Sequence, residues 1–138
     1  MGAPAKLLVN IDVDDLVRAE AFYTAAFGLT AARRFGRAGV EMIGLAAPIY
    51  LLAKAAGTAI APDSAATRDY RRHWTPVHID IAVDDLDAAI DRAKAAGAVM
   101  EQEARSSGWG RIAMFADPFG HGFCLIEFTE AGYDAIAD

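Results

Sequence analysis

Apolar and polar residues alternate near the beginning of the chain, and the same alternation returns in its second half. The first run extends from Leu7 to Val13 and the second from Val77 to Val83, with apolar side chains at the odd-numbered positions. A period of two is typical of a β-strand that buries one face. We therefore expect two strands whose odd positions pack against helices and whose even positions lie on the opposite face.

A short motif recurs within the two runs. The motif Ile-x-Val-Asp-Asp-Leu occupies residues 11–16 and returns at residues 81–86, at an offset of 70 positions (81 − 11 = 70). In both copies an aspartate suited to cap a helix precedes apolar residues at helical spacing. A glycine suited to a left-handed helix end follows, at Gly28 and at Gly97. The repeat indicates two similar modules, each with a strand followed by a helix.

Three shorter strand candidates follow each expected helix. The order of one strand, one helix and three strands thus occurs twice, which predicts an α+β fold of two tandem βαβββ modules. We expect a single domain over residues 1–138, with module one at about 6–54, a linker at 55–75 and module two at about 76–129. The linker assignment rests on the loss of alternation and the gain of Ala, Pro, Ser and charged residues. The strand candidates lie near residues 30–36, 39–45 and 48–54, and near 98–104, 110–116 and 122–128.

The composition narrows the classes of protein that the chain fits. With 138 residues, of which 54% are hydrophobic, the chain is long enough to bury a core of its own. A formal net charge of −6 disfavours nucleic acid as a partner, and no run of 18 apolar residues predicts a membrane span. The single cysteine, Cys124, forms no disulfide within the chain. We expect a cytoplasmic protein whose fold depends on packing alone.

Three sequence features together resemble one protein superfamily. They are Val-Asp-Asp-Leu at the start of both expected helices, Ala-Phe-Tyr at residues 21–23, and Asp-Pro-Phe-Gly-His-Gly at residues 117–122. With the duplication, they resemble the glyoxalase, bleomycin-resistance and dioxygenase (vicinal oxygen chelate) superfamily over residues 6–129. The resemblance implies that the two modules form a curved mixed sheet around a central cavity, and that the protein is a homodimer, as many members are. The Asp-Pro-Phe-Gly segment itself predicts a turn before the last strand rather than a catalytic motif.

Metal-using members of this superfamily hold a divalent ion with one residue from the first and one from the last strand of each module. By this resemblance the four positions are Leu8, Tyr50, His78 and Cys124. Only His78 matches the usual ligand set, because leucine has no donor atom, tyrosine keeps its proton up to a pKa of about 10 and a cysteine thiolate is a soft ligand. We therefore favour a protein without a metal cofactor. The alternative is an atypical divalent-metal site of His78, Cys124 and Tyr50.

If odd positions pack on helices, even positions of the first and last strands line the cavity. His78 and Asp80 share one face of a strand, so the imidazole and the carboxylate could act as general acid and base. The imidazole could equally do no more than satisfy an internal hydrogen bond. Trp109 could offer a stacking surface at the cavity mouth or simply pack over the core. The residues expected to line a ligand site are Asn10, Asp12, Tyr50, Leu52, His78, Trp109, Met114, Cys124, Ile126 and Phe128.

A basic cluster stands inside the expected linker and consists of Arg68, Arg71, Arg72 and His73. Arginines in such a cluster could hold a carboxylate or a phosphate at the rim of the cavity. The cluster could instead be a solvated part of the linker or a contact in a dimer.

Together these observations favour a protein that binds a small organic ligand in its cavity without the usual metal, in the manner of a bleomycin-resistance protein. Such a protein acts in sequestration or resistance, and the acidic balance suits a cationic ligand. The alternative is a metal-dependent enzyme, a glyoxalase-like lyase, an isomerase or a dioxygenase with an atypical site that contains His78. The two hypotheses differ in whether the purified protein holds a stoichiometric metal ion.

Overall fold

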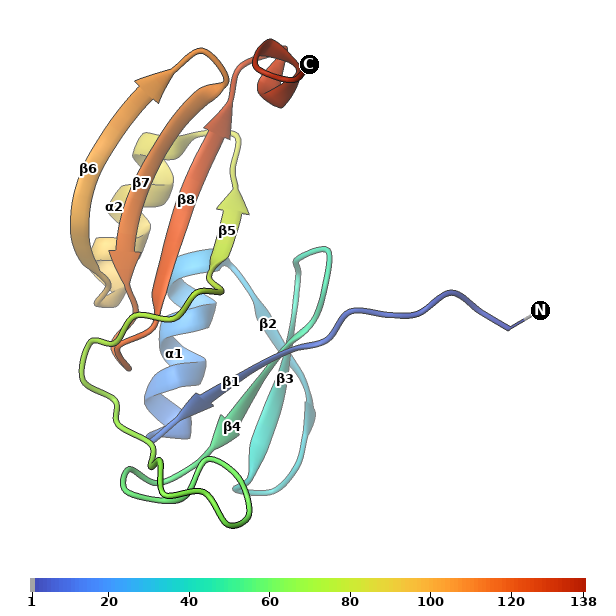
Figure 1. The fold of residues 1–138 in the computed structure, drawn as a ribbon, viewed down its shortest axis with the longest axis vertical. Coiled ribbons are helices and arrows are strands. Elements are labelled where there is room, and N and C mark those ends of the chain that lie inside the picture. The colour runs from blue at the N-terminus through green and yellow to red at the C-terminus, as the bar shows by residue number, and fades with distance from the viewer. Residues whose placement is uncertain (1) are drawn as a thin grey trace. The chain divides into compact units, whose positions relative to one another are not determined.

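The computed structural model of this chain describes residues 2–138. The chain folds into two compact units, of which the first ends at Tyr70 and the second runs from Arg71 to Asp138. Each unit contains a four-stranded mixed sheet and one α-helix, with the elements in the same order (Figure 1). The structure thus confirms the expected α+β fold of two tandem βαβββ modules, and each module has a sheet of its own.

The first module follows the expected order from strand to helix to three strands. Its elements are β1 (Val9–Val13), α1 (Leu16–Phe27), β2 (Thr30–Arg34), β3 (Gly39–Ile43) and β4 (Ile49–Ala53). In space the strands are arranged β1-β4-β3-β2, with β1 parallel to β4 and the other pairs antiparallel. Asn10 lies opposite Tyr50, so the two side chains share one face of the sheet.

The second module repeats this arrangement. Its elements are β5 (Ile79–Ala82), α2 (Leu86–Ala96), β6 (Val99–Ser107), β7 (Gly110–Ala116), β8 (Gly122–Phe128) and the short 3-10 helix η1 (Gly132–Ala135). The strand order β5-β8-β7-β6 again places the first strand parallel to the last. Asp80 lies opposite Cys124, at the position that Asn10 and Tyr50 occupy in the first module.

Both helices begin and end where the sequence predicts. Asp15 and Asp85 cap the two N-termini, each carboxylate accepting the backbone N–H three residues further on at 3.0 Å. Gly28 and Gly97 end the helices in the left-handed region, with φ of 67° and 113°. A side chain is strained at such φ values, which explains why both modules have glycine there.

Each core lies between a sheet and the helix of the same module. The residues that are at most 1% exposed include Val13, Val40 and Leu51 in the first module and Ala113, Phe115 and Leu125 in the second. The buried helix residues are Ala19, Phe22, Tyr23 and Ala26 in α1 and Leu86, Ala89, Ile90 and Ala93 in α2.

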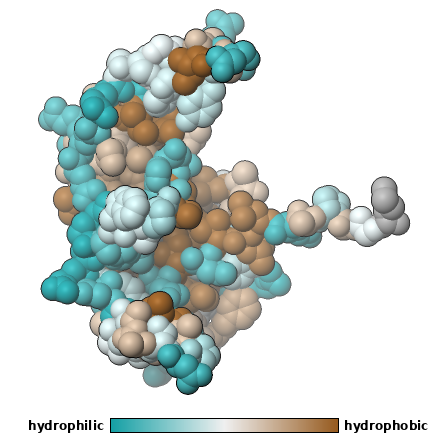
Figure 2. Space-filling view, viewed as in Figure 1, coloured by the Kyte–Doolittle hydropathy of each residue, from teal (hydrophilic) through white to brown (hydrophobic). Residues whose placement is uncertain are grey.

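The packing predicted for the first residues of the two alternating runs is wrong. Leu7 and Val77 precede β1 and β5, and their side chains are 70% and 79% exposed rather than packed on helices. Leu8 is also half exposed, and Figure 2 shows hydrophobic surface at the base of the extended N-terminal segment. The alternation of apolar and polar residues therefore begins two residues before β1 and β5 pair with their neighbouring strands.

The residues between the last strand of one module and the first strand of the next are attached to both modules. Arg68 Nε donates to Asp12 Oδ2 at 2.8 Å, and the Tyr70 hydroxyl donates to the carbonyl of Lys54 at 2.6 Å. These contacts hold residues 55–70 on the first module, whereas Arg71 and its successors belong to the second. Among the described residues, no helix combines the length and apolar character that crossing a bilayer requires.

Candidate functional site

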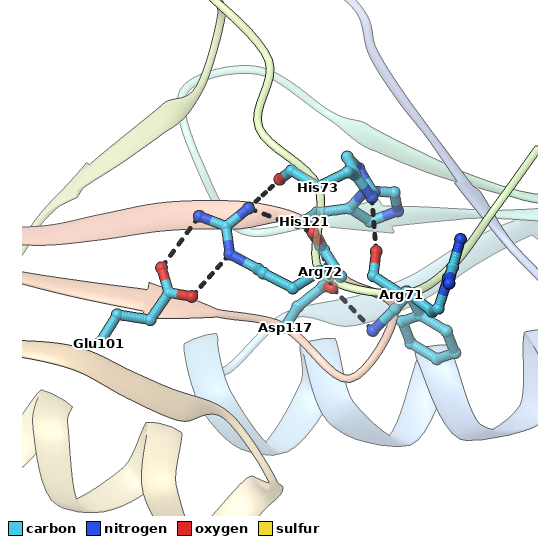
Figure 3. A network of polar contacts seen from close by, with 8 residues as sticks. Arg71, Arg72, His73, Glu101, Asp117 and His121 are labelled. Atoms are coloured by element: carbon cyan, nitrogen blue, oxygen red, sulfur yellow. Dashed lines mark hydrogen bonds and ion pairs between the residues drawn. The ribbon is translucent and has the colours of Figure 1, made fainter.

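Residues Arg71–Thr75, here called the strap, are fastened to the second module by polar contacts (Figure 3). Arg72 forms a bidentate ion pair with Glu101 on β6, at 2.6 Å from Nε and 2.9 Å from Nη2. Its Nη1 donates to the carbonyls of His73 and Gly120. The hydrogen bonds between the two side chains raise the pKa of Arg72 and lower the pKa of Glu101, so both stay charged at neutral pH.

Gly122 leaves the space that the Arg72 guanidinium occupies. A Cβ atom at position 122 would lie 2.7 Å from Arg72 Nη2, which is too close for the ion pair to keep its geometry. The backbone N–H of His73 also donates to the carbonyl of Gly120 at 3.2 Å. The strap is therefore anchored at two places, the outer strand β6 and the turn before β8.

The turn at residues 117–120 is built around a buried carboxylate. Asp117 is 3% exposed, and its Oδ1 accepts the backbone N–H groups of Phe119 at 2.8 Å and His121 at 2.9 Å. Phe119 is fully buried, and Gly120 adopts a positive φ of 84° that closes the turn. The segment has the structural role expected from the sequence, and it presents the carbonyl of Gly120 to the strap.

The strap and the facing ends of β7 and β8 enclose a pocket of about 140 Å³. Its wall combines aromatic and aliphatic surface with a few polar groups, and Trp74 contributes an indole that is 80% exposed. Three residues of the expected ligand site, His78, Met114 and Cys124, line this pocket together. Its full lining is Arg72, Trp74, Thr75, His78, Met114, Phe115, Gly122, Phe123 and Cys124.

Three potential ligand atoms converge beside this pocket, from His78, Asp80 and Cys124. His78 Nε2 lies 3.0 Å from Asp80 Oδ1, and the donor atoms of all three residues lie within 4.8 Å of one another. The Cys124 side chain is buried, and desolvation together with the nearby Asp80 carboxylate raises the pKa of the thiol to about 11. Because the thiolate is the nucleophilic form, Cys124 is a poor nucleophile at neutral pH.

The other residues expected to line a ligand site lie elsewhere. Trp109 and Phe128 pack with Tyr133 of η1, with ring centroids 4.8 to 6.1 Å apart, so Trp109 covers this end of the module. Ile126 is 2% exposed and part of the core. The structure does not place these three among the residues that line the pocket. The remaining expected residues belong to the first module and are Asn10, Asp12, Tyr50 and Leu52.

The corresponding face of the first module carries a charged cluster that the sequence analysis did not single out. Glu41 lies opposite Tyr50 and accepts its hydroxyl at 2.6 Å, while Arg33 pairs with Glu41 at 2.9 to 3.0 Å and donates to Tyr50 at 2.9 Å. The hydrogen bond from Arg33, and then that from Tyr50, lowers the pKa of Glu41 to about 2. The pKa of Tyr50 is raised, mainly by its bond to Glu41, so its hydroxyl keeps its proton. The sequence feature that could have revealed this cluster is Glu41, the single charged residue in the otherwise apolar strand β3.

This cluster predicts a pH-dependent stability of the first module. Since the pKa of Glu41 is depressed in the folded state, its contribution is complete above its ordinary pKa of 4.5 and disappears as the pH falls towards 2. We expect Glu41→Gln to lower the melting temperature by a few degrees at pH 7, and the difference from the native protein to shrink between pH 4.5 and 2. Circular dichroism melts measure it, with Asp63→Asn as the control. A difference that persists unchanged at pH 2 would contradict the assignment.

Comparison with known proteins agrees with this architecture. The family model of the glyoxalase-like domain matches residues 8–126. The chain therefore belongs to the glyoxalase-like family, within the superfamily of glyoxalases, bleomycin resistance proteins and dioxygenases.

The names of one relative and one similar solved structure refer to antibiotics. The anthracycline biosynthesis protein DauV of Streptomyces sp. (strain C5) is 35% identical over 132 residues, which cover 94% of this chain and 43% of DauV. This chain thus spans less than half the length of that relative. TnmS3, an antibiotic binding protein from Streptomyces sp. CB03234, has a similar fold, with a TM-score of 0.62 and 22% identity over 94% of this chain and 99% of TnmS3.

A third similar protein bears on whether this chain could hold a divalent metal ion. A variant of the fosfomycin resistance protein FosX from Listeria monocytogenes, solved with Mn(II) and a dihydroxypropylphosphonic acid, has a TM-score of 0.66 and 20% identity over 95% of this chain and 94% of its own. Mn²⁺ favours oxygen and nitrogen ligands. The set of His78, Asp80 and Cys124 offers one nitrogen, one oxygen and a thiol that resists ionisation. This donor set does not fit Mn²⁺, and among common ions it suits Zn²⁺ better.

Proposed function

We propose that the second module binds an aromatic small molecule by inserting one of its rings into the pocket under the strap, directly and without a metal ion. The observation that carries this proposal is the exposed indole of Trp74 on the wall of a pocket whose floor is aromatic. Phe115 and Phe123 stack on each other there, with ring planes 12° apart. An indole left 80% exposed next to such a floor gains contact area when a flat ligand covers it.

The size of the pocket defines what it accepts. A cavity of about 140 Å³ is close to the size that holds a single benzene ring, and it is smaller than a site that encloses a whole drug-sized molecule. One ring of a larger ligand therefore enters, and the remainder extends from the mouth. Anthracyclines, which are fused aromatic ring systems, are the compounds with which the relative DauV is associated by name.

A carboxylate next to the pocket favours a ligand with a positive charge, since Arg72 in the pocket wall is already paired with Glu101. Asp80 keeps 39% of its side chain exposed beside His78, so its carboxylate is accessible to a ligand cation. The net charge of −6 adds a general attraction for cations. A cationic group attached to the aromatic ring system would pair with this carboxylate.

The chemistry of the wall supports binding without turnover. The Cys124 thiol holds its proton up to a pKa of about 11, and the donors that converge on it do not fit the ion held by FosX. The proposed role is sequestration or carriage of the ligand. The metal-dependent enzyme remains the rival hypothesis, and it requires an ion at His78, Asp80 and Cys124.

Isothermal titration calorimetry with a cationic anthracycline tests the proposal, and bleomycin serves as a second ligand. We expect Trp74→Ala to weaken anthracycline binding about fivefold, because loss of an aromatic stacking contact costs on the order of 1 kcal/mol. Trp109→Phe is the matched control and should leave the affinity unchanged, since Trp109 packs with Phe128 and Tyr133.

Treatment with a chelator separates the proposal from its rival. The affinity is expected to be the same before and after EDTA treatment and dialysis. Binding that needs added Zn²⁺ and disappears in His78→Ala would favour the enzyme hypothesis instead. Absence of heat with either ligand at millimolar concentration, or equal affinities for the native protein and Trp74→Ala, would overturn the proposal.

A further inference from the structure

We propose that His73 on the strap and His121 at the start of β8 form a second site, which binds a divalent transition-metal ion such as Ni²⁺ or Cu²⁺ through two imidazoles. His73 Nε2 lies 2.9 Å from His121 Nδ1, and the ring centroids are 4.8 Å apart with the planes at 76° (Figure 3). These residues differ from the cluster of His78, Asp80 and Cys124 and do not line the pocket.

The distance between the two nitrogens is compatible with chelation. Imidazole nitrogens bind such metals at about 2.0–2.1 Å, so two of them at a right angle around one ion lie about 2.9 Å apart. A tetrahedral angle would require about 3.3 Å between the nitrogens. The observed 2.9 Å therefore equals the nitrogen separation in square-planar or octahedral complexes of Cu²⁺ and Ni²⁺, so the backbone can stay in place while the two rings rotate to turn their lone pairs from each other towards the ion.

The orientation of the His73 ring presents the correct nitrogen. His73 Nδ1 lies 2.9 Å from the carbonyl oxygen of Arg71, which accepts a hydrogen bond and therefore fixes the proton on Nδ1. The lone pair of the neutral ring is then on Nε2, which points at His121. Histidines that bind metals commonly donate their other N–H to a backbone carbonyl in this manner.

The two histidines are also held in place by their backbones. The N–H of His73 donates to the carbonyl of Gly120 at 3.2 Å, and the N–H of His121 donates to the buried Asp117 carboxylate at 2.9 Å. The carbonyl of His121 accepts the N–H of Asp117 at 2.8 Å. Because the turn fixes both ligands before the ion arrives, little conformational entropy is lost on binding.

The donor set also defines the class of ion. Neutral imidazoles suit Cu²⁺, Ni²⁺ and Zn²⁺, whereas Ca²⁺ and Mg²⁺ require oxygen ligands. In the present structure a hydrogen bond joins the two nitrogens, so the ion replaces a proton at this place. Both rings are half buried, and water completes the coordination of the ion.

A bound ion would connect the strap to β8 by coordinate bonds in place of a hydrogen bond. The neighbours of His73 in the chain, Arg72 and Trp74, both line the ligand pocket. The ion would therefore stiffen the wall that carries Trp74. The metal site itself does not depend on the ligand proposed for the pocket, because none of its donor atoms lines it.

Titration of the full chain with Ni²⁺ in a non-coordinating buffer at pH 7.5 tests this inference, with calorimetry as the readout. We expect one ion per chain in the native protein, and an affinity at least tenfold lower in His73→Gln and in His121→Gln. His78→Gln removes the histidine of the other donor set, so an unchanged affinity in this variant assigns the Ni²⁺ ion to the pair of His73 and His121. Its affinity for Ni²⁺ should equal that of the native protein.

A spectroscopic measurement shows whether a lower affinity in the variants comes from loss of a metal ligand rather than from unfolding. The electron paramagnetic resonance spectrum of the Cu²⁺ complex should show coupling to two nitrogens in the native protein and in His78→Gln, and to fewer in each single variant of the pair. Circular dichroism confirms that the variants are folded. Absence of Ni²⁺ binding, equal affinity in the double variant of His73 and His121, or loss of the ion in His78→Gln would overturn the inference.

Discussion

Phe119→Ala is expected to lower the free energy of unfolding of the second module by about 3–5 kcal/mol, the usual effect of removing a fully buried phenylalanine ring. Phe119 has no exposed surface and lies in the turn between β7 and β8. The loss combines the transfer free energy of the ring with the cost of the cavity that it leaves. The effect is large because the backbone of the turn is fixed by Asp117 and has little freedom to collapse into that cavity.

Urea denaturation followed by tryptophan fluorescence measures this change. Both tryptophans of the chain, Trp74 and Trp109, lie in the second unit, so their fluorescence reports the unfolding of that unit. Val99→Ala is the control, since Val99 is 61% exposed on β6 and its replacement should change the stability by about 0.5 kcal/mol or less. A change below about 1 kcal/mol for Phe119→Ala would show that the ring is not part of the core.

Asp117→Ala is expected to have the second largest effect, a loss of about 2–4 kcal/mol. The substitution leaves the N–H groups of Phe119 and His121 without the carboxylate that accepts them, and each unsatisfied buried donor costs about 1–3 kcal/mol. The carbonyl of Gly120, which accepts the backbone N–H of His73, is part of the same turn. Loss of the carboxylate should therefore also loosen the strap.

Two measurements separate these consequences. The tryptophan-detected urea midpoint gives the stability, and amide hydrogen exchange at His73 gives the opening of the strap, which should be faster in Asp117→Ala. Asp117→Asn retains an oxygen in the same place and should recover most of the stability. If the asparagine variant were as unstable as the alanine variant, the negative charge rather than the hydrogen bonds would be the stabilising factor.

The helices were predictable from the sequence because their ends have a local chemical cause. Asp15 and Asp85 bind N–H groups only three residues away, and Gly28 and Gly97 supply a backbone conformation that other residues adopt at a cost. Such signals need no knowledge of the tertiary structure. The structure accordingly has an aspartate cap within each Asp-Asp-Leu motif, and the helices end at the predicted Gly28 and Gly97.

The strands were predictable in order but less well in length, because a strand begins where it finds a partner. Leu7 and Val77 continue the alternation, yet pairing in the parallel ladders starts only at Val9 opposite Ile49 and at Ile79 opposite Phe123. The strand β6 is longer than expected and reaches Ser107. It lies at the edge of its sheet and carries several charged residues, a composition that protects an edge but weakens the sequence signal for a strand.

The strap was the part of the candidate site that sequence patterns could not place. Residues 71–75 have no periodicity, and the ion pair between Arg72 and Glu101 joins positions 29 residues apart. Contacts of this kind depend on tertiary folding, which single-sequence patterns do not encode.

The state of the single cysteine has a practical consequence for spectroscopy. Because the pKa of the Cys124 thiol is raised to about 11 and the side chain is buried, maleimide reagents, which require a thiolate, should leave it unmodified at neutral pH. A cysteine introduced at an exposed position such as Val77 would then be the only one to accept a fluorophore or a spin label. Probes can thus be attached to either module while the native residue stays in the wall of the pocket.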